Sequence, residues 1–224
     1  MLSWDDYWKR YEVSKAERWM IGERHALLDR CLDALGTGTK KVLEVGCGAG
    51  NNILRLHEMR GDVECHGLDF SEVSVEKLRG RIPFVHRADC RETGLPDGQY
   101  DLIFSSGLME HFPDESPLVR EMRRIVKPGG LMVTSIPARY SLWQLYKHAQ
   151  GRNWIHGYEK SYTRRGLVKV LEQGGWAVEE VVGLDPFSFN GFAMKLLGRS
   201  FRPLWTRNVF PAGYTELMAV TRPA

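Results

Sequence analysis

The sequence has few cysteines and no apolar run long enough to cross a membrane. Its four cysteines, Cys31, Cys47, Cys65 and Cys90, never stand in Cys-x-x-Cys spacing. We therefore expect neither a zinc site nor a disulfide framework, and no bound metal. The chain opens Met-Leu-Ser-Trp-Asp-Asp, without a basic and then apolar start, so we expect no secretion signal. These absences together predict a reducing, cytoplasmic location.

A large excess of charge of one sign is also missing. The 31 basic and 28 acidic residues give a net charge of +3, which by itself does not indicate a nucleic-acid partner. We interpret the basic clusters at 120–124 and 160–165 as exposed helix faces. Beyond residue 138 basic residues outnumber acidic ones. This asymmetry leaves open a mildly anionic substrate or a peripheral contact with a membrane surface.

The chain contains no internal repeat, low-complexity run or linker, and its 224 residues suit one domain. Strand-like segments alternate with segments of helical periodicity, which predicts a parallel sheet with helices on both faces. The expected strands lie near 41–46, 63–68, 82–88, 100–106 and 130–136, and the helices between them near 50–59, 71–80 and 115–126. A helix over 15–35 precedes them, while a helix from Thr163 to Gly174 and strands over 176–182 and 214–221 follow.

A glycine-rich loop directly follows the first expected strand. Gly46, Gly48 and Gly50 permit a sharp turn and the close approach of a ligand to the backbone. A dinucleotide fingerprint would place its third glycine where Asn51 stands. Glu44 would repel a pyrophosphate and attract an ammonium group. The loop therefore predicts a cofactor that carries an amino-acid group rather than a dinucleotide.

Acidic residues follow the next two expected strands. Asp69 comes about twenty residues after the loop, where a carboxylate can accept both ribose hydroxyls of a nucleoside. Its alternative role is the N-cap of the helix that starts near Ser71. Asp89 follows the third strand, where an ordinary turn residue is the alternative.

These motifs resemble those of the class I S-adenosylmethionine-dependent methyltransferases. The glycine loop with Glu44 is similar to motif I of that family, and residues 100–112 and 127–134 resemble segments of its type 11 subgroup. The resemblance covers roughly residues 40–136. It implies an α/β, Rossmann-like fold with a seven-stranded sheet, mostly parallel with an antiparallel last strand. It also implies S-adenosyl-L-methionine as methyl donor and S-adenosyl-L-homocysteine as product.

The resemblance assigns a set of cofactor contacts. Asp89 would accept the adenine amino group, with Ala88 and Cys90 beside the base. The full expected set is Glu44, Gly46, Cys47, Gly48, Asn51, Asp69, Phe70, Asp89, Cys90 and Ser106.

Three segments outside these motifs are candidates for acceptor recognition in a single domain over 1–224. The aromatic stretch 4–11, within a helical cap over 1–38, either folds across the cofactor or packs on the sheet edge. Residues 138–162 form a first insertion, in which we expect Trp143, Trp154 and Tyr158 to bind the substrate. Residues 185–213 form a second insertion, which suits a lid or a patch for a partner, another subunit or a bilayer.

Methyl transfer needs an aligned acceptor and the exclusion of water, and a protonated acceptor also needs a base. His111 and His156 are the candidate catalytic residues, because histidine suits proton transfer near neutral pH. A hydrogen bond from His111 that only holds its loop is the alternative. Glu110 could replace it as base, or could cap the helix near Asp114.

We expect methylation of an oxygen or nitrogen of a small organic acceptor. The alternatives are a macromolecule (RNA or protein), a membrane-associated lipid or quinone, and a non-catalytic subunit that binds the cofactor. Ser105-Ser106-Gly107-Leu108 stands where enzymes that methylate base or amide nitrogens carry an Asn/Asp-Pro-Pro-Tyr-type tetrapeptide. This difference disfavours nucleic acid as the acceptor. The sequence leaves open whether the protein forms oligomers.

Overall fold

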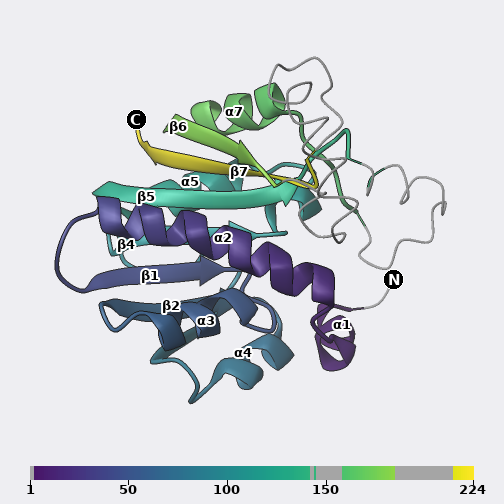
Figure 1. Ribbon diagram of the computed structural model, residues 1–224, viewed down its shortest axis with the longest axis vertical. Coiled ribbons are helices and arrows are strands. Elements are labelled where there is room, and N and C mark those ends of the chain that lie inside the picture. Colours follow the sequence, from purple (N-terminus) through teal and green to yellow (C-terminus); the bar gives the residue numbers. More distant parts are fainter. Residues whose placement is uncertain (1–2, 142–143, 145–157, 185–213) are drawn as a thin grey trace, which may run out of the picture.

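The computed structural model describes residues 3–141, 144, 158–184 and 214–224. Its centre is a seven-stranded sheet in the order β3-β2-β1-β4-β5-β7-β6 (Figure 1). The strands are β1 (Lys40–Val45), β2 (Val63–Asp69), β3 (Phe84–Arg87), β4 (Tyr100–Ser106), β5 (Val126–Pro137), β6 (Trp176–Gly183) and β7 (Glu216–Pro223). β7 runs antiparallel to β5 and β6, and the other paired strands are parallel. The predicted fold class is confirmed.

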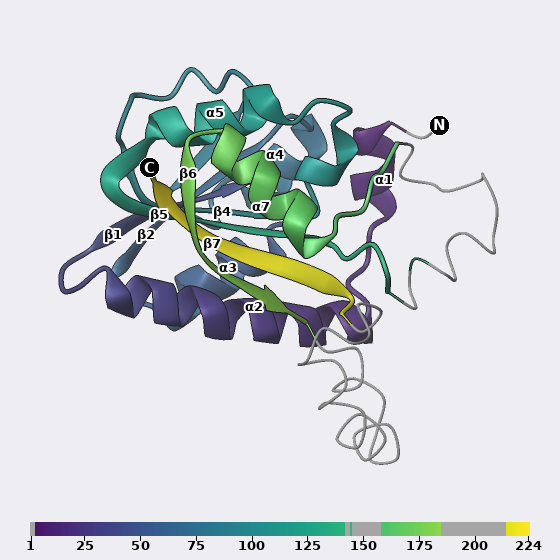
Figure 2. The same cartoon turned by 90° about the horizontal axis from the view of Figure 1, so that it is seen from above.

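Helices cover both faces of this sheet (Figure 2). They are α1 (Trp4–Arg10), α2 (Lys15–Ala34), α3 (Asn51–Met59), α4 (Glu72–Leu78), α5 (Ser116–Ile125) and α7 (Arg164–Gln173), with a 3-10 turn η1 (Met109–His111). Hydroxyl N-caps begin several of them: Ser14, Ser71 and Thr163 each accept a hydrogen bond from a backbone N–H in the first turn.

Neighbouring strand residues point to opposite faces and so supply two apolar cores. Val42 joins the core under α2 and α3, whereas Leu43 joins the core under α5 and α7. The two cores hold the sheet between its helices. All four cysteines are buried, and none forms a disulfide. Within the described ranges no helix is long and apolar enough to span a bilayer.

The fifth strand begins earlier than predicted. β5 starts at Val126, which pairs with Tyr100, so residues 126–129, which precede the expected strand over 130–136, lie within it at a register shift. A Cβ on Gly130 would lie 2.8 Å from the carbonyl oxygen of Asp101. Glycine is therefore needed here because β5 passes unusually close to the backbone of β4.

The order of the strands reverses between β1 and β4, so the loops after β1, β2 and β4 meet at one edge of the sheet. Ligands of open α/β sheets bind at such a switch point. The helix α1 lies at this edge beside α4. The Ser71 hydroxyl donates to Asp5, and the Lys77 ammonium donates to the carbonyl of Trp8. These contacts fix α1 near the ends of the central strands.

Candidate functional site

The glycine loop after β1 lies tightly between its neighbours. Gly46, Gly48 and Gly50 have φ values of 69°, 51° and 76°, in the region that favours glycine. A Cβ on Gly46 would come within 2.8 Å of Leu108, and one on Gly48 would overlap the ring of Trp8. The loop therefore needs glycine both for its turn and for close packing beneath two covering side chains.

Glu44 connects the end of β1 to the start of α3. It is 2% exposed and accepts hydrogen bonds from Asn52 Nδ2 (2.8 Å) and the backbone N–H of Ile53 (2.9 Å). Burial raises the pKa of this carboxyl to about 7, although the two hydrogen bonds oppose the shift. Glu44 thus holds the loop in place and also contributes to a cavity wall.

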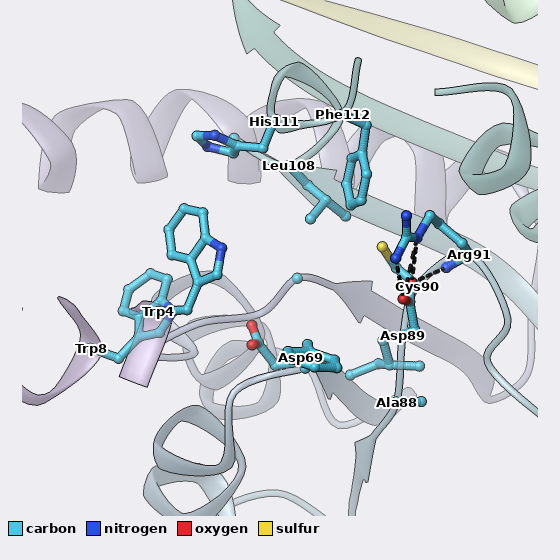
Figure 3. Close-up of a pocket in the computed structure, with 14 residues that line it drawn as sticks. Trp4, Trp8, Asp69, Ala88, Asp89, Cys90, Arg91, Leu108, His111 and Phe112 are labelled. Atoms are coloured by element: carbon cyan, nitrogen blue, oxygen red, sulfur yellow. Dashed lines mark hydrogen bonds and ion pairs between the residues drawn. The ribbon is translucent and has the colours of Figure 1, made fainter. Parts of the chain in front are cut away.

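The first cavity, of about 300 Å³, lies at the ends of β1, β2 and β4 (Figure 3). It is lined by Trp4, Trp8, Gly46, Leu68, Asp69, Phe70, Ala88, Asp89, Cys90, Arg91, Gly107, Leu108, His111 and Phe112. The expected ribose and adenine contacts are therefore brought together in one concave space with apolar walls.

Asp69 is 8% exposed and faces the first cavity. Its Oδ2 accepts from the Gly48 N–H at 2.7 Å and its Oδ1 from the Ser71 N–H at 2.9 Å. Each carboxylate oxygen keeps a second lone pair for a ligand hydroxyl. Burial raises the pKa of Asp69. The alternative role as N-cap is wrong, because Ser71 occupies the cap position of α4.

Asp89 is a hydrogen-bonded turn residue that also lines the first cavity, and its contact with adenine stays a prediction. It lines the first cavity, and it also accepts from the backbone N–H of Arg91 (2.9 Å) and from its guanidinium (2.6 Å), as Figure 3 shows. The guanidinium holds the pKa of Asp89 below its usual value. Arg91 also lies 5.4 Å from the ring centroid of Phe112. The turn after β3 is thus fixed where the adenine contact is expected.

The second cavity, of about 260 Å³, adjoins the first and differs from it in its many polar side chains. It is lined by Trp4, Tyr7, Trp8, Tyr11, Glu17, Met20, Arg24, Glu44, Gly46, Cys47, Ala49, Asn51, Asn52, Ser106, Gly107, Glu110, His111, Pro137, Glu159 and Glu216. It includes the predicted Cys47, Asn51 and Ser106. Trp4, Trp8, Gly46, Gly107 and His111 line both cavities.

His111 stands at the junction of the two cavities. Its Nδ1 lies 3.0 Å from the carbonyl oxygen of Tyr158 and must donate to it, since a carbonyl only accepts. The neutral ring therefore carries its lone pair on Nε2. The ring of Trp4 packs edge-on against it, with centroids 5.0 Å apart. His111 thus makes the hydrogen bond expected of a residue that holds its loop, and it also lines both cavities; its catalytic role stays a prediction.

Glu110, beside it, is 2% exposed and lines the second cavity. Among the described residues its Oε2 has no hydrogen-bond partner, and burial raises the pKa of the carboxyl to about 8. The expected helix-capping role is wrong, because Asp114 accepts from the Ser116 N–H at the start of α5.

Several predicted residues stand apart from this arrangement. His156, Trp143, Trp154 and the segment 185–213 lie outside the described residues. Tyr158 is half-exposed and is not among the described residues that line either cavity; its carbonyl instead holds His111. Gly48 is also not among the described residues that line either cavity; its N–H donates to Asp69.

Sequence reasoning gave no role to several lining residues, among them Arg91, Leu108 and Phe112. Leu108 and Phe112 lie in the matched segment 100–112, but that pattern does not indicate which of its side chains face a cavity. Arg24 donates to Glu216 at 2.5 and 3.1 Å across 192 positions of sequence. No local pattern connects residues so far apart, so only the folded chain reveals this pair.

Comparisons with known proteins give a consistent result. A family described as a methyltransferase domain matches residues 42–130. A protein from Mycolicibacterium smegmatis that carries the name "probable S-adenosylmethionine-dependent methyltransferase" is 30% identical over 190 residues, which cover 82% of this chain. The chain spans 64% of that relative.

Two further proteins are similar. A demethylmenaquinone methyltransferase from Geobacillus kaustophilus is 27% identical over 186 residues, covering 70% of this chain and 78% of the relative. The crystal structure of an S-adenosylmethionine-dependent methyltransferase from Archaeoglobus fulgidus superposes with a TM-score of 0.66 at 20% identity, over 90% of this chain and 93% of that one. At this identity the likeness shows the fold alone.

Proposed function

The chain belongs to the class I S-adenosylmethionine-dependent methyltransferases, and we therefore propose that it methylates an oxygen or nitrogen of a small organic acceptor. One observation carries the proposal: a cavity with nucleoside-type contacts adjoins a polar cavity, and the two share Gly46, Gly107 and His111. The donor would extend from the first cavity to the glycine-loop wall of the second, and the acceptor would meet its methyl group at these shared residues.

The residues of the first cavity and the glycine loop fit S-adenosylmethionine. Asp69 would accept the ribose hydroxyls with the lone pairs left by Gly48 and Ser71, and Asp89 would accept the adenine amino group. Glu44 and Asn51 would face the methionine end. When bound, the donor supplies a methyl group made electrophilic by a sulfonium.

The chain itself contributes alignment, shielding and a base. Trp4 and Trp8 of α1 line both cavities and shield their junction from water. His111 lies at that junction with its lone pair on Nε2, and we assign it the removal of the acceptor proton. A cavity of about 260 Å³ suits a small acceptor rather than a polymer. We also propose that the 224 residues form one catalytic domain.

Calorimetry with S-adenosylhomocysteine tests the proposal. The wild-type protein should bind it without added metal, and Asp69→Asn should weaken binding by roughly 1.5–3 kcal/mol, because one charged acceptor of the ribose is lost. Asn retains an oxygen for one of the two backbone N–H groups. Asp114→Asn, an exposed change that keeps a capping side chain at α5, is the control. Tight binding of a nicotinamide dinucleotide instead would overturn the assignment.

A further inference from the structure

Arg24 of α2 brings a buried positive charge into the wall of the second cavity. It is 7% exposed and is the one guanidinium in the described lining, which contains no lysine. Taking a guanidinium out of water is costly, so a buried arginine is expected to be paired and hydrogen-bonded. The contacts of Arg24 therefore indicate what this charge does.

One partner of Arg24 is Glu216 of β7. Arg24 Nε donates to Glu216 Oε2 at 3.1 Å and Nη2 to Oε1 at 2.5 Å, and the Ser135 hydroxyl donates to the same carboxylate at 2.6 Å. This two-point contact fixes the plane of the guanidinium. A guanidinium carries five N–H donors, and the contact with Glu216 uses two of them. Arg24 is thus held in a defined orientation and keeps donors for a second acceptor.

The proposed methyl donor presents such an acceptor to this cavity. The glycine loop after β1 lines the cavity through Gly46, Cys47 and Ala49, and we have assigned this wall to the amino-acid end of S-adenosylmethionine. Near neutral pH that end carries an ammonium and a carboxylate on one carbon atom. Acidic side chains such as Glu44 suit the ammonium and repel the carboxylate. The carboxylate therefore needs a positively charged partner in the same wall.

Arg24 lies within electrostatic reach of two acids of this wall. Burial raises the pKa of Glu110 to about 8 and that of Glu44 to about 7, and the positive charge of Arg24 opposes both shifts. Both carboxyls therefore carry less negative charge near neutral pH than an ordinary glutamate does. A ligand carboxylate beside Arg24 is accordingly repelled less than the number of acids in the lining suggests.

The side-chain amides of the same wall are weaker candidates for this contact. Asn52 Nδ2 donates to Glu44 at 2.8 Å, and Asn51 Nδ2 donates to the Tyr11 hydroxyl at 3.0 Å. Each amide keeps one N–H, but it carries no charge. Hydrogen bonds between charged groups are shorter and stronger than those of neutral groups. Arg24 is therefore the lining residue best suited to a carboxylate.

We propose that Arg24 binds the carboxylate of the methyl donor and selects ligands that carry this group. The inference rests on the proposed methyltransferase function and adds to it a specificity residue outside the sequence motifs. Glu216 is the positioning residue, because it orients the guanidinium. A guanidinium matches a carboxylate both in charge and in the geometry of a two-point contact. Adenine nucleosides without the carboxylate should therefore bind more weakly.

Two matched ligands test this preference. S-adenosylhomocysteine and S-adenosyl-3-thiopropylamine share the nucleoside, the thioether and the ammonium, and they differ only in the carboxylate. In calorimetry, the full-length wild-type protein should bind S-adenosylhomocysteine roughly tenfold or more tightly, as expected for hydrogen bonds between charged groups. Equal affinities for the two ligands would overturn the inference. Failure to bind either ligand would instead overturn the proposed function itself.

Variants connect the preference to Arg24. Arg24→Gln should bring the ratio of the two affinities close to one, through weaker binding of S-adenosylhomocysteine alone. Arg24→Lys keeps the charge but not the two-point geometry, so it should retain part of the ratio. Arg30→Gln is the matched control, because Arg30 also lies on α2 and pairs with a glutamate, Glu180 of β6, at 2.6 Å on the exposed surface. This control should keep the wild-type ratio.

Variants of Glu216 separate ligand binding from a purely structural ion pair. Arg24→Gln leaves Glu216 without its charged partner, which can prevent folding. The double variant Arg24→Gln/Glu216→Gln replaces both charges by amides and leaves neither of them unpaired. It should show a ratio close to one, whereas Glu216→Gln, which keeps Arg24, should still prefer S-adenosylhomocysteine. If the ion pair only joined α2 to β7, every variant would keep the wild-type ratio, and this outcome would contradict the inference.

Discussion

The His111 side chain is held by its neighbours at the place where we propose that it acts as a base. The Tyr158 carbonyl fixes its tautomer through Nδ1, and Trp4 packs against its ring. A base must be held in a defined orientation before it can accept a proton efficiently. The contact with Tyr158 is therefore compatible with the proposed role of His111 as base and does not have to be an alternative to it.

Replacing His111 separates these two contributions. His111→Gln can still donate an amide N–H to the Tyr158 carbonyl but offers no basic nitrogen. Its single-turnover rate should fall roughly a hundredfold, and the acid limb of the rate profile should flatten. Affinity for S-adenosylhomocysteine should persist. The exposed His57→Gln is the matched control. A His111→Gln enzyme with nearly the full rate and the same acid limb would leave His111 only a holding role.

Single residues were predictable from sequence where a strand end determines their position. Glu44, Asp69 and Asp89 lie at or just beyond the carboxyl ends of β1, β2 and β3, and parallel strands bring these ends together at one edge. The sequence did not decide whether Glu110 acts as a base or caps a helix, because a sequence does not reveal whether a carboxylate is buried. The pair of Arg24 and Glu216 depends on contact between α2 and β7, which no local pattern encodes.

At the scale of elements, the alternation of apolar and helical periods predicted nearly every described helix and strand. The early start of β5 was missed because a Pro-Gly-Gly sequence normally ends regular structure, and only the close approach of β4 explains why the strand continues there. The position of α1 was also left open. Its aromatic residues suit both a sheet edge and a cofactor cover; contacts from α4 fix α1 at the switch-point edge, where Trp4 and Trp8 line both cavities.

The contact between Lys77 and the C-terminal end of α1 gives a prediction for this cover. Lys77→Met removes the donor to the Trp8 carbonyl, so α1 should detach more often from α4. The variant should therefore bind S-adenosylhomocysteine about 3- to 10-fold more weakly than wild type, as expected for one lost hydrogen bond. Hydrogen exchange in residues 4–11 should accelerate. Lys9→Met on the exposed side of α1 is the control. Equal affinity in the two variants would remove α1 from the cofactor site.

At the scale of the whole molecule, charge is arranged in a way that composition hides. The net charge is +3, and the basic excess beyond residue 138 left open a mildly anionic substrate or a membrane surface. Folding nevertheless collects acids from α2, β1, η1 and β7 around one cavity. A sum over the sequence cannot report this local surplus, because the acids that create it are separated by up to 199 residues, from Glu17 to Glu216.

The buried acids also make stability depend on pH. Burial raises the pKa of Glu110 to about 8 and that of Glu44 to about 7. Between the ordinary pKa of each carboxyl and this raised value, the folded protein therefore binds more protons than the unfolded chain. Stability therefore falls as pH rises through these windows. Burial lowers the pKa of His25, His66 and His86, which acts in the opposite direction but only below about pH 6.5.

Between about pH 7 and 8, Glu110 should thus dominate the difference between the wild-type protein and Glu110→Gln. Without ligand, the wild-type free energy of unfolding should fall relative to that of the variant by up to about 1.4 kcal/mol per pH unit, because a neutral amide has no proton to lose. Urea unfolding at several pH values measures this difference, and Asp114→Asn should follow wild type. Parallel curves already in the absence of ligand would mean that Glu110 ionises at its ordinary pKa, in contact with water.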